Sequence, residues 1–166
     1  MNPVENHIAY RNVLMDLHQR GVEEPLIFIA DGLPGIEKEI RQLYPRADFH
    51  LCTIHASRNF ESHVKVQDRN EIDSDLKGIF LSRTREDALN QFTEFKNKWS
   101  SRYPRPVYNM EKNLGILLKY YDYPEPIRRS IHSTNLIERM NKEIRRRIKI
   151  ICLRVAEINE KWSLEH

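Results

Sequence analysis

Two apolar segments lie close together in the first third of the chain, and one helical pattern separates them. The run Leu26–Ala30 ends at Asp31, and Asp48–Cys52 forms a second candidate strand. Between them, Pro34 and Gly35 open a short amphipathic pattern that is typical of a helix. A strand, a helix and a strand in so short a span predict a βαβ unit with parallel neighbouring strands. The chain therefore has to fold around at least a small α/β layer.

The pattern becomes helical after His55 and stays helical to the end. Apolar residues recur three and four positions apart, with breaks near 67–68, 82–84 and 104–106. Thr84 is typical of a helix N-cap, and Asn6–Arg20 predicts an earlier helix that stops at Gly21. Within the segment that starts at Arg85, a stripe of Ala88, Phe92, Phe95 and Trp99 predicts core positions. The expected fold class is α/β and mostly helical, with helices over 56–66, 70–81, 85–103 and 107–121.

Composition limits the number of domains and the cellular setting. With 166 residues and 40% hydrophobic content, the chain can bury one core with a helical appendage. No apolar run is long enough to cross a bilayer and the N-terminus has no secretion signal, so we expect a cytoplasmic protein without a membrane partner. Cys52 and Cys152 cannot form a disulfide framework. Residues 164–166 resemble the remnant of an expression tag and are left out of the fold argument.

Positive charge is concentrated near the C-terminus. The net charge is only +3, yet the segment from Arg128 to Lys149 contains eight basic residues and two acidic ones. Such an uneven distribution favours one binding surface for a polyanion. A solvated helix face has the same composition, so charge alone does not decide between the two.

The helix expected from about Ser133 onward has two distinct sides. At 100° per residue, its apolar residues gather on one side, which predicts a buried face. Glu138 lies on the other side, among basic and amide side chains. That position suits a metal site facing a polyanion, but Asn135 and Glu138 also form a capping box, and Glu138 pairs with Lys142 at i,i+4. The residues of the apolar side are Leu136, Ile137, Met140, Ile144 and Ile148.

Asp31 and the Cys52-x-x-His55 motif are two further candidates. Asp31 follows a buried strand and begins a glycine turn, and α/β sheets usually have their ligand-binding and catalytic residues at this end of a strand. Asp is also a common turn residue, so the position alone does not establish a catalytic role. Cys52 and His55 have the spacing of half a zinc site. Because a zinc site needs about four ligands and no second close Cys/His pair is present, no zinc is expected.

Three ordered motifs resemble those of one known family. They are Asp31-Gly32-Leu33-x-Gly35, the segment from Tyr44 to Asn59, and Ser133-Thr134-Asn135-Leu136-Ile137-Glu138 followed by Asn141–Arg147. Together they resemble the mutator-type transposases of bacterial insertion sequences, and the similarity covers nearly the whole chain. The resemblance implies an Asp-Asp-Glu recombinase with a ribonuclease-H-like sheet that a helical insertion interrupts.

The resemblance also implies an organisation and a catalytic set. Residues 1–54 would form part of the ribonuclease-H-like core, 55–127 the helical insertion, and 128–163 the C-terminal core helix. Asp31 would be the second acid and Glu138 the third, holding two Mg²⁺ ions about 4 Å apart, with Mn²⁺ as a substitute. The first acid would lie before Met1, so we expect this chain by itself to be catalytically inactive.

The implied substrate is DNA, both transposon ends and target, in the bacterial nucleoid. The implied reaction is metal-dependent strand cleavage and strand transfer; a non-catalytic helical DNA-binding or interaction module is the alternative, and a zinc-stabilised regulatory domain a third. Cys52 and His55 would support the site, while Trp99 would either stack on a base or fill the core. An exposed sheet edge predicts a homodimer. The expected DNA contacts are Arg58, Asn59, Asn135, Asn141, Lys142, Arg145, Arg146 and Lys149.

Overall fold

The computed structural model describes residues 3–132 and 139–148, and the chain divides into two compact units. The first unit is Met1–Ser133 and the second is Thr134–His166. Each unit is described by itself. Of the helices within the described ranges, none is long and apolar enough to cross a bilayer.

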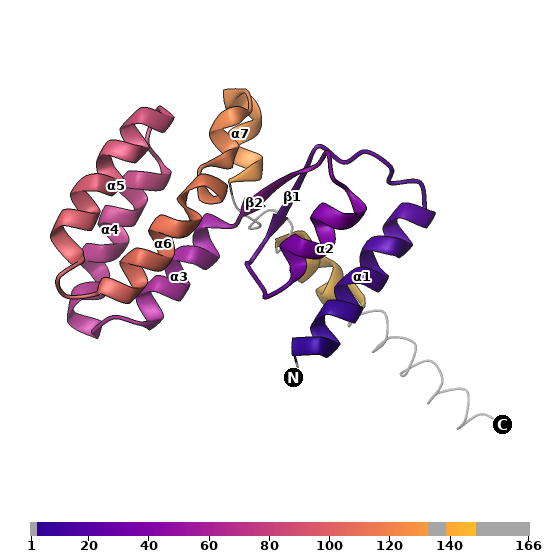
Figure 1. Ribbon diagram of the computed structural model, residues 1–166, viewed down its shortest axis with the longest axis horizontal. Helices are drawn as coiled ribbons and strands as arrows, with labels where there is room; N and C mark the ends of the chain where they lie inside the picture. Colours follow the sequence, from indigo (N-terminus) through magenta and orange to yellow (C-terminus); the bar gives the residue numbers. More distant parts are fainter. Residues whose placement is uncertain (1–2, 133–138, 149–166) are drawn as a thin grey trace, which may run out of the picture. The chain divides into compact units, whose positions relative to one another are not determined.

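A βαβ unit organises the N-terminal part of the first unit (Figure 1). Strands β1 (Ile27–Ala30) and β2 (Asp48–Leu51) are parallel, with Ala30 opposite Leu51, and α2 (Ile36–Leu43) connects them. This confirms the predicted pair of parallel strands. Helix α1 (Pro3–Gln19) packs on α2, and the Tyr44 hydroxyl donates to the Leu14 carbonyl at 3.2 Å.

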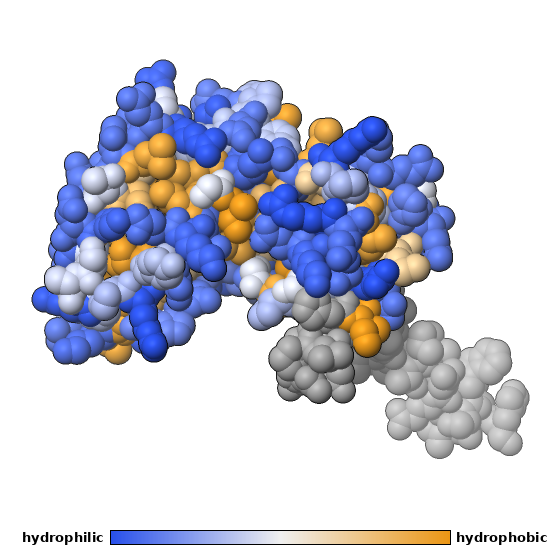
Figure 2. Space-filling model, in the orientation of Figure 1, coloured by the Kyte–Doolittle hydropathy of each residue, from blue (hydrophilic) through white to orange (hydrophobic). Residues whose placement is uncertain are grey.

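Helices make up the rest of the first unit. The core of this bundle includes Ile72, Leu76 and the predicted stripe that ends at Trp99, all of them buried. Figure 2 shows hydrophobic side chains reaching the surface of the bundle between hydrophilic ones. The described part of the chain is therefore mostly helical with two parallel strands, as the sequence indicates. The elements are α3 (Thr53–Ser62), η1 (Val66–Asp68), α4 (Arg69–Phe80), α5 (Arg85–Trp99), α6 (Pro104–Leu117), η2 (Lys119–Asp122) and α7 (Glu125–Ile131).

Helix ends were predicted well at caps and poorly at prolines. The Asp87 N–H donates to Thr84 Oγ1 at 3.1 Å, which confirms the N-cap, and Gly21 ends α1 with a φ of 91°. The break predicted near 104–106 exists but lies at 100–103, because α5 ends at Trp99 and α6 begins at Pro104. The turn expected around Pro126 instead holds α7. A proline in the first turn of a helix removes only an N–H that has no partner in the helix, so it starts a helix without breaking it.

In the second unit, residues 139–148 are helical. The prediction that their apolar stripe is buried is wrong for Met140, Ile144 and Ile148, which are all exposed. The other two stripe positions, Leu136 and Ile137, lie outside the described residues. A helix buries an apolar stripe only against a second layer, and the described part of this unit is a single helix.

Leu76 provides a test of the bundle core. Leu76 is fully buried on α4, whereas Leu81, just past the end of the same helix, is 70% exposed. We expect Leu76→Ala to lower the free energy of unfolding by about 2–5 kcal/mol, because it removes transfer energy and leaves a cavity. Leu81→Ala should change it by less than about 0.5 kcal/mol. Urea denaturation followed by circular dichroism measures both, and equal effects would contradict the packing described above.

Candidate functional site

The carboxyl ends of β1 and β2 lie side by side and form the edge where the candidate site is built. The Cys52 N–H donates to the Ala30 carbonyl at 2.8 Å, so the residues that follow the two strands share this edge. Asp31 is one of them. Its side chain is exposed and makes no hydrogen bond or ion pair with any described residue. The carboxylate is therefore available to a ligand from solvent.

The turn after Asp31 needs glycine for two reasons. Gly32 has a φ of 80° and Gly35 a φ of 91°, in the left-handed region that side chains disfavour. A Cβ at Gly32 would also lie 2.6 Å from Leu51 Cδ1. The turn thus packs directly against the Leu51 side chain at the end of β2.

Helix α3 starts at the same edge and places the second sequence motif there. Cys52 is fully buried at its N-cap, and His55 Nδ1 lies 3.3 Å from the Cys52 sulfur. Arg58 and Asn59 follow on the next turn of the helix, and both are exposed. No group of three His, Cys, Asp or Glu side chains within the described ranges is placed to hold a metal ion. The absence of zinc stays a prediction.

His50 ties two distant segments to β2. Its ring is fully buried, with Nδ1 2.9 Å from the Ile116 carbonyl oxygen and Nε2 3.0 Å from the His132 carbonyl oxygen. Thr53 Oγ1 donates to the same His132 oxygen at 2.9 Å. Burial lowers the pKa of His50 below its usual value. These contacts hold the end of α7 at the carboxyl edge of the strands.

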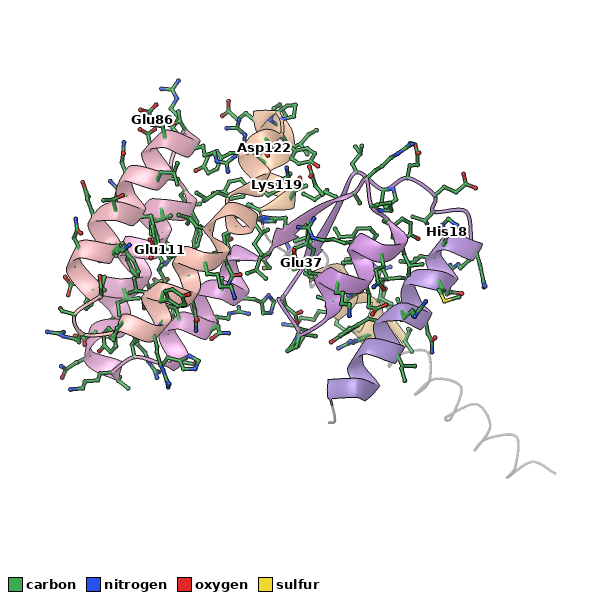
Figure 3. The ribbon with its side chains drawn as sticks, viewed as in Figure 1. His18, Glu37, Glu86, Glu111, Lys119 and Asp122 are labelled. Atoms are coloured by element: carbon green, nitrogen blue, oxygen red, sulfur yellow. The ribbon has the colours of Figure 1, made fainter. Side chains whose placement is uncertain are left out.

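The acids at the opposite end of the strands are already neutralised. Lys119 Nζ lies 3.0 Å from Asp48 Oδ1 and 2.9 Å from Asp122 Oδ2, and Figure 3 shows Lys119 and Asp122 side by side. Tyr123 also donates its hydroxyl to Asp48 at 2.8 Å. Hydrogen bonds to Asp122 and Asp48 raise the pKa of Lys119. This cluster stabilises the fold, in contrast to the unpartnered Asp31.

Trp99 occupies the core position of the helical stripe. Its ring is buried, and its Nε1–H donates to Asp75 Oδ2 at 2.8 Å. A base could reach this ring only if the bundle opened. Of the two roles considered from sequence, the structure supports the core role.

In the second unit, the described part of the basic helix carries two kinds of cation. Glu143 accepts from Arg146 at 2.7 Å and from Arg147 at 3.1 Å, and the bond from Arg146 holds the pKa of Glu143 below its usual range. Lys142 and Arg145 are exposed and make no ion pair with a described residue. Asn141 is exposed as well. Asn135, Glu138 and Lys149 lie outside the described residues, so the pairing of Glu138 with Asp31 stays a prediction.

Comparison with known proteins identifies the family. The family model described as "Transposase, Mutator family" matches residues 1–154. The chain belongs to this family. It is 34% identical over 147 residues to the transposase for insertion sequence element IS1201 of Lactobacillus helveticus, and 37% identical over 147 residues to that for IS905 of Lactococcus lactis. Each alignment covers 89% of this chain, but only 40% and 37% of the two relatives. This Mutator-family chain thus spans about two fifths of the length of these relatives.

Sequence reasoning located the edge that carries Asp31 but missed the groups that shape it. His50 and Thr53 were not singled out, because a polar residue in a short strand or at a helix start looks the same whether it is buried or solvated. Their common partner, the His132 carbonyl, is 82 residues away from His50. No local signal in the sequence of this Mutator-family chain reveals that contact.

The need for glycine at position 32 of this Mutator-family chain can be tested by comparing Gly32→Ala with Gly21→Ala, since both glycines have a positive φ. Gly21→Ala places a side chain at a φ of 91° with no atom within 4 Å of the new Cβ, so we expect a loss of about 1 kcal/mol from backbone strain alone. Gly32→Ala carries the same backbone strain and also requires the flexible end of the Leu51 side chain to shift, so it should cost at least as much. Urea denaturation of both variants gives the comparison. A Gly32→Ala variant as stable as the wild-type chain would contradict the positive φ of Gly32.

His50 should make stability depend on pH. Because its pKa is lowered in the folded chain, the unfolded chain binds the proton more tightly, and stability is lost as pH falls through the folded pKa. We expect the free energy of unfolding to drop between about pH 7.5 and 5 more steeply in the wild-type chain than in His50→Gln. Urea titrations across this range measure both slopes. Parallel slopes would show that His50 contributes no proton linkage.

Proposed function

We propose that this chain is part of a DNA transposase that catalyses metal-dependent strand cleavage and strand transfer. The observation that carries the proposal is the exposed, unpartnered Asp31 at the carboxyl edge of two parallel strands. Crevices at this edge are where open α/β sheets place their ligand sites. Membership of the Mutator family supports the same conclusion, since the relatives are named as transposases for insertion sequence elements.

Asp31 fits a divalent metal ion of the Mg²⁺ type. Its carboxylate supplies the hard oxygen ligands that Mg²⁺ or Mn²⁺ prefers, and no described cation competes for it. We propose Asp31 as the second acid of the catalytic set and Glu138 as the third. Bound metal would help to activate the attacking hydroxyl and to stabilise the leaving oxygen.

Basic side chains would grip the DNA backbone. Lys142 and Arg145 are the best placed in the second unit, because they carry exposed charges that no described acid neutralises. Arg58 and Asn59, on α3, would make further contacts with the DNA. Such contacts give affinity with little sequence information and make binding salt-dependent. The other proposed contacts are Asn135, Asn141, Arg146 and Lys149.

We propose that the first unit is part of a ribonuclease-H-like core with a helical insertion. The β1–α2–β2 unit is consistent with part of a ribonuclease-H-like core, and the helices from α3 to η2 with an insertion into it. Within the described residues, β1 pairs with β2 alone. A strand with a free edge favours a further partner, and we propose either another strand of the same protein or a second copy in a homodimer.

A second candidate function is a DNA-binding module without catalysis. The unpaired charges of Lys142 and Arg145 favour it, because phosphate contacts of this kind need no metal ion. The two functions differ in one measurable respect. A catalytic fragment binds divalent metal at Asp31, whereas a DNA-binding module binds DNA and leaves Asp31 without a ligand.

Metal binding at Asp31 is the decisive test. In a titration of the isotopically labelled chain with Mn²⁺, paramagnetic broadening should appear first at the amides around Asp31. Asp31→Asn should abolish this local broadening, and Glu138→Gln should weaken Mn²⁺ affinity at least about tenfold, because each removes a charged ligand. Competition with Mg²⁺ should reverse the broadening.

Asp73→Asn is the matched control. Asp73 is exposed and pairs with Lys77 on α4, so its loss should leave Mn²⁺ binding at Asp31 unchanged. If Mn²⁺ broadens the amide signals around Asp31 equally in wild type, Asp31→Asn and Glu138→Gln, the catalytic assignment is overturned. The DNA-binding module then becomes the proposed function.

A further inference from the structure

A groove of about 680 Å³ lies between α3 and α6 in the first unit. Asn59 lines it from α3, while Arg105, Tyr108 and Asn113 line it from α6. Its lining also includes Leu51, the last residue of β2. Because Leu51 touches the turn beside Asp31, the groove connects the bundle surface with the carboxyl edge of the strands.

The chemistry of the groove suits a nucleic acid strand. None of the residues that line it is Asp or Glu, and its polar side chains are one arginine, one histidine, one tyrosine and three asparagines. Asparagine amides both donate and accept hydrogen bonds, and an arginine supplies a cation for phosphate. A groove that binds a cation would present acidic side chains, and a groove that binds a purely apolar ligand would present few polar ones. The groove therefore favours a ligand with phosphates and hydrogen-bonding bases.

Tyr108 and Arg105 differ from their neighbours in the bundle. Tyr103 and Tyr120 are buried, and their hydroxyls donate to Asp68 and to the Phe80 carbonyl. Tyr108 is 64% exposed and its hydroxyl makes no hydrogen bond with a described residue. In the same way, Arg102 pairs with Asp68 at 2.8 Å, whereas Arg105, three residues later, has no described partner. The ring and the cation are thus exposed in one groove with neither committed to the fold.

We propose that this groove binds an unpaired DNA strand and leads it to the edge that carries Asp31. Tyr108 stacks on a base, and Arg105 contacts a backbone phosphate. The groove has the volume of a small-ligand pocket, which accommodates a nucleotide or two but not a duplex. Stacking of bases on exposed aromatic rings beside cations is the usual way in which proteins hold single strands. The choice of DNA as the ligand rests on the proposed function.

Fluorescence anisotropy of the full chain tests the proposal. The probes are a labelled oligothymidine of about 12 nucleotides and a duplex of the same length, both in EDTA so that metal binding plays no part. Tyr108→Leu should weaken binding of the single strand about tenfold, while Tyr108→Phe, which keeps the ring, should bind as wild type does. Duplex binding should be unchanged in both.

Two variants that each remove one positive charge distinguish binding in the groove from general electrostatic attraction of DNA to the chain. Arg105→Gln should weaken single-strand binding and lower its salt slope by about one. Arg83→Gln removes the same charge from the exposed loop before α5, and Arg83 is not among the residues that line the groove. Arg83→Gln should therefore have little effect. Urea midpoints equal to wild type confirm that each variant is folded.

Two results would overturn the inference. Wild-type affinity in both Tyr108→Leu and Arg105→Gln would remove the groove from DNA binding, yet leave metal binding at Asp31 and the proposed function intact. Equal losses for single strand and duplex would show that the groove does not select an unpaired strand. A wild-type chain that binds neither probe would contradict the groove and also the DNA-binding part of the proposed function.

Discussion

The parallel pairing of β1 and β2 is the constraint on which the candidate site depends. Because Ala30 lies opposite Leu51, the residues after both strands are brought to one edge. Asp31 leaves β1 there, and α3 starts there from β2. His50 and Thr53 then hold the end of α7 at the same place through the His132 carbonyl. A shift of one residue in this register would turn His50 away from its two carbonyl partners and separate these elements.

Polar groups in the described residues fall into two classes, and the difference has a functional meaning. Asp48 and Asp68 have cationic or hydroxyl partners and stabilise packing between elements. Asp31, Arg105 and Lys142 have no described partner. An exposed charge without an ion pair gives little stability, but it can bind a ligand without first breaking a contact. The unpartnered groups are therefore the ones on which the functional proposals rest.

Much of the local structure could be predicted from the sequence. The strand pair, the Thr84 cap, the Gly21 stop and the core stripe ending at Trp99 all follow from periodicity and capping chemistry, which act over a few residues. The break between α5 and α6 lies a few residues before the position that the prolines indicate, because Pro104 begins a helix. The stripe of Met140, Ile144 and Ile148 was expected to be buried, because periodicity reveals an apolar side but not whether a second layer covers it.

The sequence by itself determined that the chain has a βαβ unit, that an acid ends its first strand, and that helices follow. These features depend on side-chain spacing and on the conformational preferences of glycine and proline. The tertiary structure was needed to show that His50 joins α6 and α7 to β2, and that Asn59 and Tyr108 face one groove. These contacts join residues roughly fifty to eighty positions apart, and such pairings arise from packing, which no local pattern encodes.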